Sequence, residues 1–108
     1  MTEFSVLLAP EALSDVRQVV IWIGEQSPLD ATKWHNGVMA AIQTLATHPL
    51  RCPLAPEDSH FELEIRQLIY GRYRILFSIA QKRIRILRVL HGARDYILPD
   101  IDDTDFEM

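Results

Sequence analysis

Three strand-like segments follow one another with only two residues between them, and this spacing constrains the fold more than any other feature. The segments cover residues 62–70, 73–80 and 83–90, joined by Gly71-Arg72 and Gln81-Lys82. In the middle segment Ile75, Phe77 and Ile79 recur at every second position, which is the period of a strand with one buried face. Because two-residue connections join antiparallel neighbours, the sequence predicts a three-stranded antiparallel meander.

The first part of the chain predicts a strand and then a helix. Residues 3–8 are strand-like, and Pro10 then opens a helix that we expect to end near Gly24 to Ser27. The apolar stripe of this helix is Leu13, Val16, Val20 and Ile23.

A second helix begins directly after the first. Ser27 is its expected N-cap, and His48-Pro49 stops it, because the residue before a proline disfavours helical geometry. Its apolar stripe is Ala31, Trp34, Val38, Ile42 and Leu45. We expect both Trp22 and Trp34 to pack in the core.

The order of elements is therefore β-α-α-β-β-β, which belongs to the α+β class. Two helices joined by a short connection pack as a hairpin, and a hairpin that precedes a meander covers one face of the sheet. We predict an antiparallel sheet covered on one face by this hairpin, with an open, polar second face. Residues 1–98 form a single domain, and residues 99–108 form an acidic tail.

Composition excludes several classes of protein. The chain has 108 residues, of which 48% are hydrophobic, so one core of ordinary size is expected. Cys52 is the only cysteine, which rules out an internal disulfide, and the histidines lack the spacing of metal ligands. We expect a cytoplasmic protein with no membrane span, no metal and no cofactor, since no glycine-rich phosphate loop is present.

Charge is distributed unevenly along the chain. Residues 1–64 carry a net charge of −6, residues 65–94 carry +8 with no acidic side chain, and residues 95–108 carry −6. A local field of this size can attract a polyanion even though the whole chain is at −4. The simpler interpretation is that these basic side chains alternate with apolar residues because one face of the sheet is exposed to solvent.

The basic segment holds the candidate catalytic residues. Arg66 and Arg74 lie on polar faces of adjacent predicted strands, where they would form a cationic shelf. The last strand is followed by His91, Arg94 and Tyr96. Arginines can clamp an RNA phosphate, and histidine or tyrosine can move the proton of a 2′-hydroxyl. Contacts to RNA or a protein partner are assigned to Arg72, Arg83, Arg85 and Arg88.

The sequence resembles the RelE/ParE superfamily of bacterial type II toxin–antitoxin systems over roughly residues 3–98. The segments that carry the resemblance are Val20-Ile21-Trp22-Ile23, Ala41-Ile42-Gln43-Thr44-Leu45, Tyr70-Gly71-Arg72-Tyr73-Arg74 and Leu90-His91-Gly92-Ala93-Arg94. The resemblance implies a growth-arresting toxin, neutralised by a cognate antitoxin that wraps around it. The resemblance leaves open whether the toxin forms a dimer or a heterotetramer with the antitoxin.

The superfamily implies two different targets. RelE-like members cut mRNA on the ribosome, and ParE-like members bind DNA gyrase without acting as nucleases. The resemblance places the family arginines at Arg74 and Arg94 and keeps His91 as a candidate, whereas Glu64 and Arg66 stand where the ribonucleases have two lysines. Both targets therefore remain open, as does a third reading, a non-toxic module that only binds an antitoxin-like partner.

Overall fold

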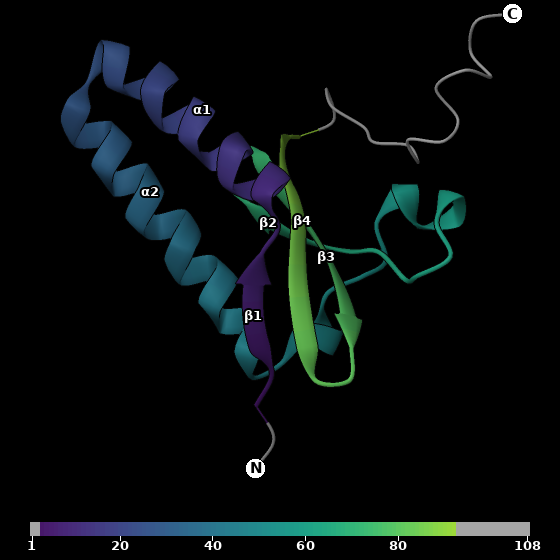
Figure 1. Ribbon diagram of the computed structural model, residues 1–108. Helices are drawn as coiled ribbons and strands as arrows, with labels where there is room; N and C mark the ends of the chain where they lie inside the picture. Colours follow the sequence, from purple (N-terminus) through teal and green to yellow (C-terminus); the bar gives the residue numbers. More distant parts are fainter. Residues whose placement is uncertain (1–2, 93–108) are drawn as a thin grey trace, which may run out of the picture.

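The computed structural model describes residues 3–92, which form a four-stranded sheet and two long helices (Figure 1). The elements are β1 (Ser5–Leu8), α1 (Pro10–Gln26), α2 (Pro28–Gln43), β2 (Arg66–Tyr70), β3 (Tyr73–Ala80) and β4 (Arg83–His91). This is the predicted α+β order β-α-α-β-β-β. Residues 93–98 of the predicted domain and the predicted tail at 99–108 lie outside the described residues.

The helical hairpin forms as the sequence predicts. Pro10 and Pro28 each occupy the start of a helix, where a missing N–H costs no hydrogen bond. Between the helices, Ser27 Oγ accepts a hydrogen bond from the Asp30 N–H at 3.2 Å, so the expected N-cap is confirmed. The α-helical geometry of α2 ends at Gln43, earlier than His48, and continues as a short 3₁₀ turn over Thr44–Ala46.

The sheet has the strand order β1-β4-β3-β2. The predicted meander is confirmed, because β2 and β4 both pair antiparallel with β3. The expectation of a wholly antiparallel sheet is wrong in one respect, since β1 pairs with β4 in parallel and the sheet is mixed. Both helices and the first two strands of the meander lie between these strands in sequence. The chain then returns as β4, which lies beside β1 and runs in the same direction.

The main core lies between the helical hairpin and the inner face of the sheet. It joins Val16, Val38 and Ile42 of the helices to Phe77 and Ile86 of the strands. On α1 the predicted stripe is rotated, because Ala12 is buried whereas Leu13 is 46% exposed. The expectation that Trp22 packs in the core is wrong, since this side chain is 65% exposed.

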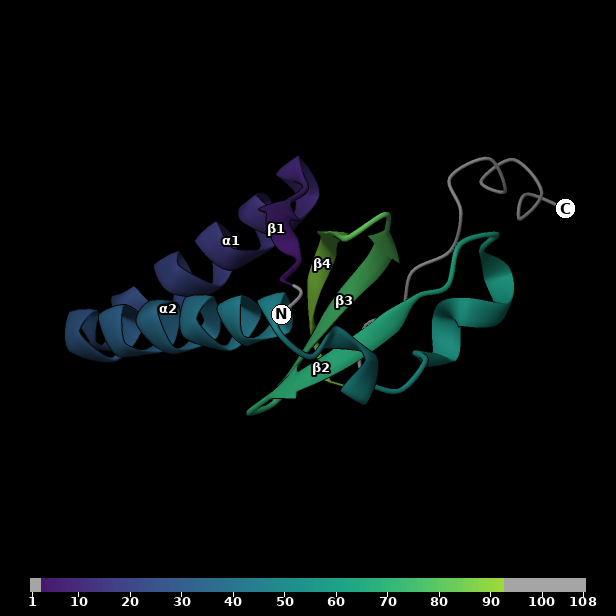
Figure 2. The same ribbon diagram turned by 90° about the horizontal axis from the view of Figure 1, so that it is seen from below.

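The second face of the sheet is half covered, which the sequence did not predict. A cap segment (residues 53–65) crosses this outer face, on the side opposite α1 and α2 (Figure 2). Its Ala55 and Ile65 pack on Leu76 and Leu90 of the sheet and form a second, smaller core. Residues 62–65 were predicted as strand, but β2 begins only at Arg66 because the preceding residues belong to this cap.

Candidate functional site

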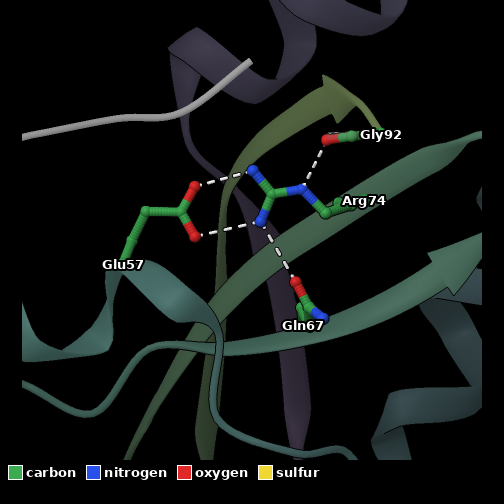
Figure 3. A network of polar contacts seen from close by, with 4 residues as sticks. All are labelled: Glu57, Gln67, Arg74 and Gly92. Atoms are coloured by element: carbon green, nitrogen blue, oxygen red, sulfur yellow. Dashed lines mark hydrogen bonds and ion pairs between the residues drawn. The ribbon is translucent and has the colours of Figure 1, made fainter. Parts of the chain in front are cut away.

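Arg74 lies in the buried contact between the cap segment and the outer face of the sheet (Figure 3). Its two terminal nitrogens donate to both carboxylate oxygens of Glu57, at 2.9 and 2.7 Å. The Arg74 Nε donates to the Gly92 carbonyl at 2.7 Å, and one terminal nitrogen also donates to Gln67 Oε1 at 3.1 Å. Arg74 is 8% exposed and Glu57 is fully buried, so this guanidinium is held by protein groups.

Arg66 does not lie beside Arg74. The register of β2 and β3 pairs Arg66 with Phe77 and Ile69 with Arg74. Because side chains alternate between faces, Arg66 projects toward the inner, helix-covered side and Arg74 toward the outer side. The predicted cationic shelf is therefore wrong. Arg66 instead donates to the Cys52 carbonyl at 2.6 Å and pairs with Glu64 at 3.2 Å.

Arg88 is tied to the start of α1. Its Nε and one terminal nitrogen donate to the two carboxylate oxygens of Asp15, at 2.7 and 3.0 Å. The same carboxylate accepts a hydrogen bond from the Val89 backbone N–H at 2.9 Å. It therefore satisfies a backbone donor of β4 that lies beyond the residues paired with β1. This arrangement fastens α1 to β4, and it is a structural role for an arginine that the sequence assigned to partner contacts.

His91 lies at the end of β4 in a cluster of aromatic rings. Its ring packs edge-on against Tyr73, with centroids 5.3 Å apart, and Tyr73 packs edge-on against Trp34 at 5.2 Å. Two of the predicted catalytic residues, Arg94 and Tyr96, lie outside the described residues. The structure therefore places His91 next to Tyr73 and, of the predicted catalytic group, describes Arg66, Arg74 and His91, which it does not bring together.

Four basic side chains are exposed at the two ends of the meander. They are Arg72, Lys82, Arg83 and Arg85. Within residues 3–92 none of the four forms an ion pair, in contrast to Arg66, Arg74 and Arg88. Lys82 is the member that the sequence reasoning did not select, although its place in a two-residue turn predicts exposure.

The partners of the buried arginines were also missed by sequence reasoning. Glu57 lies 17 residues before Arg74, in a proline-rich stretch without periodicity that predicts only a loop. Asp15 lies 73 residues before Arg88. Asp15 lies outside the predicted apolar stripe of its helix, and Glu57 lies in a stretch without periodicity, so no local pattern indicates that either carboxylate binds a distant arginine.

Cys52 is a buried core residue rather than a reactive thiol. It is 4% exposed, and burial raises the pKa of its thiol, while the nearby Arg51 and Arg66 oppose that rise. A thiol held protonated is a poor nucleophile. This agrees with the absence of a catalytic-cysteine pattern around it in the sequence.

Chemically, the described residues separate salt-bridged arginines, which are Arg66, Arg74 and Arg88, from exposed cations that form no ion pair within residues 3–92. The paired group holds the fold together, because each carboxylate satisfies an arginine at hydrogen-bond distance. The unpaired group can bind an acidic partner. No helix among residues 3–92 has the length and apolar character needed to span a bilayer.

Comparisons with known proteins agree with the fold. A chain of the chromosomal ParDE toxin–antitoxin system from P. aeruginosa superposes with a TM-score of 0.68 at 18% identity, covering 82% of this chain and 96% of that one. A chain of the toxin–antitoxin complex RelBE2 from Mycobacterium tuberculosis superposes with a TM-score of 0.55 at 25% identity, covering 83% of this chain and 99% of that one. No curated protein sequence matches the chain significantly.

The sequence itself matches one protein family over nearly its whole length. The profile of the ParE toxins of type II toxin–antitoxin systems aligns with residues 6–96. The alignment includes both helices, all of the meander and the half-buried aromatic cluster. Within the RelE/ParE superfamily that the sequence resembles, the match is to the ParE toxins. The chain therefore belongs to the ParE toxin family of type II toxin–antitoxin systems.

Proposed function

We propose that this toxin arrests growth in the cytoplasm by binding DNA gyrase, and not by cutting mRNA. One observation carries the proposal: Arg74, at the position that the resemblance gives to a family arginine, donates from both terminal nitrogens to the two carboxylate oxygens of buried Glu57. A nuclease of this design needs an arginine that reaches the scissile phosphate and stabilises its added charge. Here that guanidinium is already neutralised by a carboxylate.

Releasing Arg74 toward a substrate would be costly. Glu57 is fully buried, and removing the partner of a buried ion pair costs about 3–5 kcal/mol because the remaining charge is uncompensated. Arg66 cannot replace Arg74, since it projects from the opposite face of the sheet. Both facts favour a toxin that binds its target over one that performs catalysis at this position.

The proposal includes a cognate antitoxin as a partner. The two structural relatives come from systems described as ParDE and as the RelBE2 toxin–antitoxin complex. On this chain α1 exposes Leu13, Ile21 and Trp22, of which Ile21 is 58% and Trp22 is 65% exposed. Ile21 and Trp22 are adjacent near the end of α1, so together they offer an exposed apolar surface on which an antitoxin segment can fold.

The target is tested by running two assays on one preparation of toxin. Purified toxin at saturating concentration is expected to block supercoiling by purified gyrase and to leave message intact in a coupled translation reaction. Ribosome-dependent cuts in the message, with supercoiling unaffected, would overturn the proposal. If neither reaction is affected, the non-toxic interaction module becomes the better account.

The antitoxin surface is tested by co-purification with the protein of the adjacent gene. Replacing Ile21→Ala and Trp22→Ala together is expected to weaken the complex by about tenfold or more, since each large apolar side chain contributes about 1.5 kcal/mol or more when buried. Leu50→Ala is the matched control, because Leu50 is 66% exposed and lies away from α1. Equal loss from both variants would place the antitoxin elsewhere.

A further inference from the structure

The half of the outer face that the cap segment leaves uncovered carries a compact basic surface. We call it the hairpin patch, and it consists of Leu7, Lys82, Arg83 and Arg85. Leu7 pairs with Arg85 across β1 and β4, and two positions along the same face Ser5 pairs with Arg83. Leu7 is 66% exposed and lies opposite Arg85, so an exposed apolar side chain borders the cations at one end of the patch.

The backbone of this hairpin is strained where the patch ends. Gln81 and Lys82 form the two-residue connection between β3 and β4, with φ of 53° and 66°. Such turns favour asparagine and glycine, because other residues at positive φ lose about 1 kcal/mol or more. The chain therefore holds a lysine at a position where glycine would be more stable, and strain of this kind is typical of binding surfaces.

We propose that residues 100–107 of the same chain bind the hairpin patch and compete there with acidic partners. This segment contains Asp100, Asp102, Asp103, Asp105 and Glu107, and no basic side chain. It also contains Phe106, whose ring matches the exposed Leu7. Five acidic groups and one aromatic ring thus complement three cations and one apolar side chain.

The length of the intervening chain permits this contact. β4 runs from Arg83 to His91, so the patch lies about 26 Å back along the strand from its end, at about 3.3 Å per residue. Asp100 follows Gly92 by eight residues, which span at most about 26–29 Å when extended. Asp100 can therefore reach the patch only if the chain between is fully extended back along the sheet. The later acidic residues can reach it without full extension.

The contact is electrostatic and partly exposed, which makes it weak and dependent on salt. Exposed ion pairs each contribute about 0–1 kcal/mol, and their attraction falls as the Debye length shortens. A tethered segment compensates through its high effective concentration. Binding of the segment lowers the affinity of the patch for any acidic partner, including an antitoxin or an acidic surface of the target.

Paramagnetic relaxation in the full-length toxin alone tests the inference, independently of the target. A nitroxide is attached at Met108→Cys, while native Cys52 stays unlabelled because it is buried and its thiol pKa is raised. At low salt the backbone amides of Leu7, Arg83 and Arg85 are expected to lose most of their intensity. Intensity is expected to return at about 0.5 M salt, where the Debye length is only about 4 Å.

Two variants separate a specific contact from general attraction. Arg83→Gln with Arg85→Gln is expected to abolish the relaxation effect, whereas Arg17→Gln with Lys33→Gln, exposed cations on the helices, is expected to leave it unchanged. Unperturbed patch amides at low salt would refute the inference. So would an effect that appears only between labelled and unlabelled molecules in a mixture, because a second copy would then be the occupant.

Discussion

The two halves of the outer sheet face use the same amino acid for opposite purposes. In the covered half, Arg74 is 8% exposed and bound by Glu57 of the cap segment. In the uncovered half, Arg83 and Arg85 are exposed and form no ion pair with any residue between 3 and 92. The difference shows that an arginine in a basic stretch becomes structural or available according to what a distant segment places over it.

The same comparison explains why net charge was a poor guide. The basic segment carries +8 in sequence, but Arg66, Arg74 and Arg88 each have a carboxylate partner. Of the exposed cations among residues 65–92, Lys82, Arg83 and Arg85 lie at or near the β3–β4 turn, and Arg72 lies at the other end of the meander. A partner is therefore expected to respond to changes at Arg83 and Arg85 much more than to the total charge of the segment.

The largest effect is expected from removing the carboxylate of the covered half. Glu57→Ala leaves Arg74 buried without its main partner and is expected to lower the free energy of unfolding by about 3–5 kcal/mol. Urea denaturation followed by circular dichroism measures this loss. Arg85→Gln, an arginine change in the uncovered half, serves as the control, and a comparable loss from both would remove the distinction between the halves.

A smaller effect is expected at the second paired arginine. Asp15→Ala removes two hydrogen bonds to Arg88 and one to the Val89 N–H, and a loss of about 1–3 kcal/mol is expected. Asp15→Asn keeps one acceptor and is expected to lose less. Equal stability of both variants and the wild type in urea would show that the α1–β4 contact contributes nothing.

Much of the fold follows from local patterns in the sequence, and the cap does not. Two-residue turns and alternating apolar residues determine the meander, and Ser27-Pro28 determines the helical hairpin, because these signals are local. The parallel pairing of β1 with β4 and the contact of Glu57 with Arg74 depend on segments far apart in sequence. The prediction that Trp22 packs in the core was wrong for a related reason. Periodicity identifies the apolar stripe of a helix, but it does not show which side of that stripe faces the sheet.

Relaxing the strained turn between β3 and β4 is expected to stabilise the folded protein. Replacing Gln81→Asn and Lys82→Gly supplies the residues that positive φ favours and is expected to add about 1 kcal/mol, or about 4–8 °C in Tm. Differential scanning calorimetry measures the shift. An unchanged or lower Tm would mean that the turn carries no strain.

The smallest stability effect is expected from the hairpin patch itself. Arg83→Gln with Arg85→Gln is expected to change the free energy of unfolding by less than about 0.5 kcal/mol, because both side chains are exposed. The same variant is expected to weaken binding of an acidic partner at low salt and to flatten its salt dependence. Titration calorimetry at two salt concentrations detects this, and an unchanged affinity would contradict a binding role for the uncovered half.

The central claim is that Arg74 is structural, and the double variant Arg74→Met/Glu57→Leu tests it most directly. Replacing a buried ion pair by apolar side chains of similar volume is often neutral or stabilising, so the variant is expected to fold. We expect it to inhibit gyrase supercoiling as strongly as the wild type. A folded variant that has lost all toxin activity would contradict the account, because it would show that the Arg74 guanidinium acts on the target.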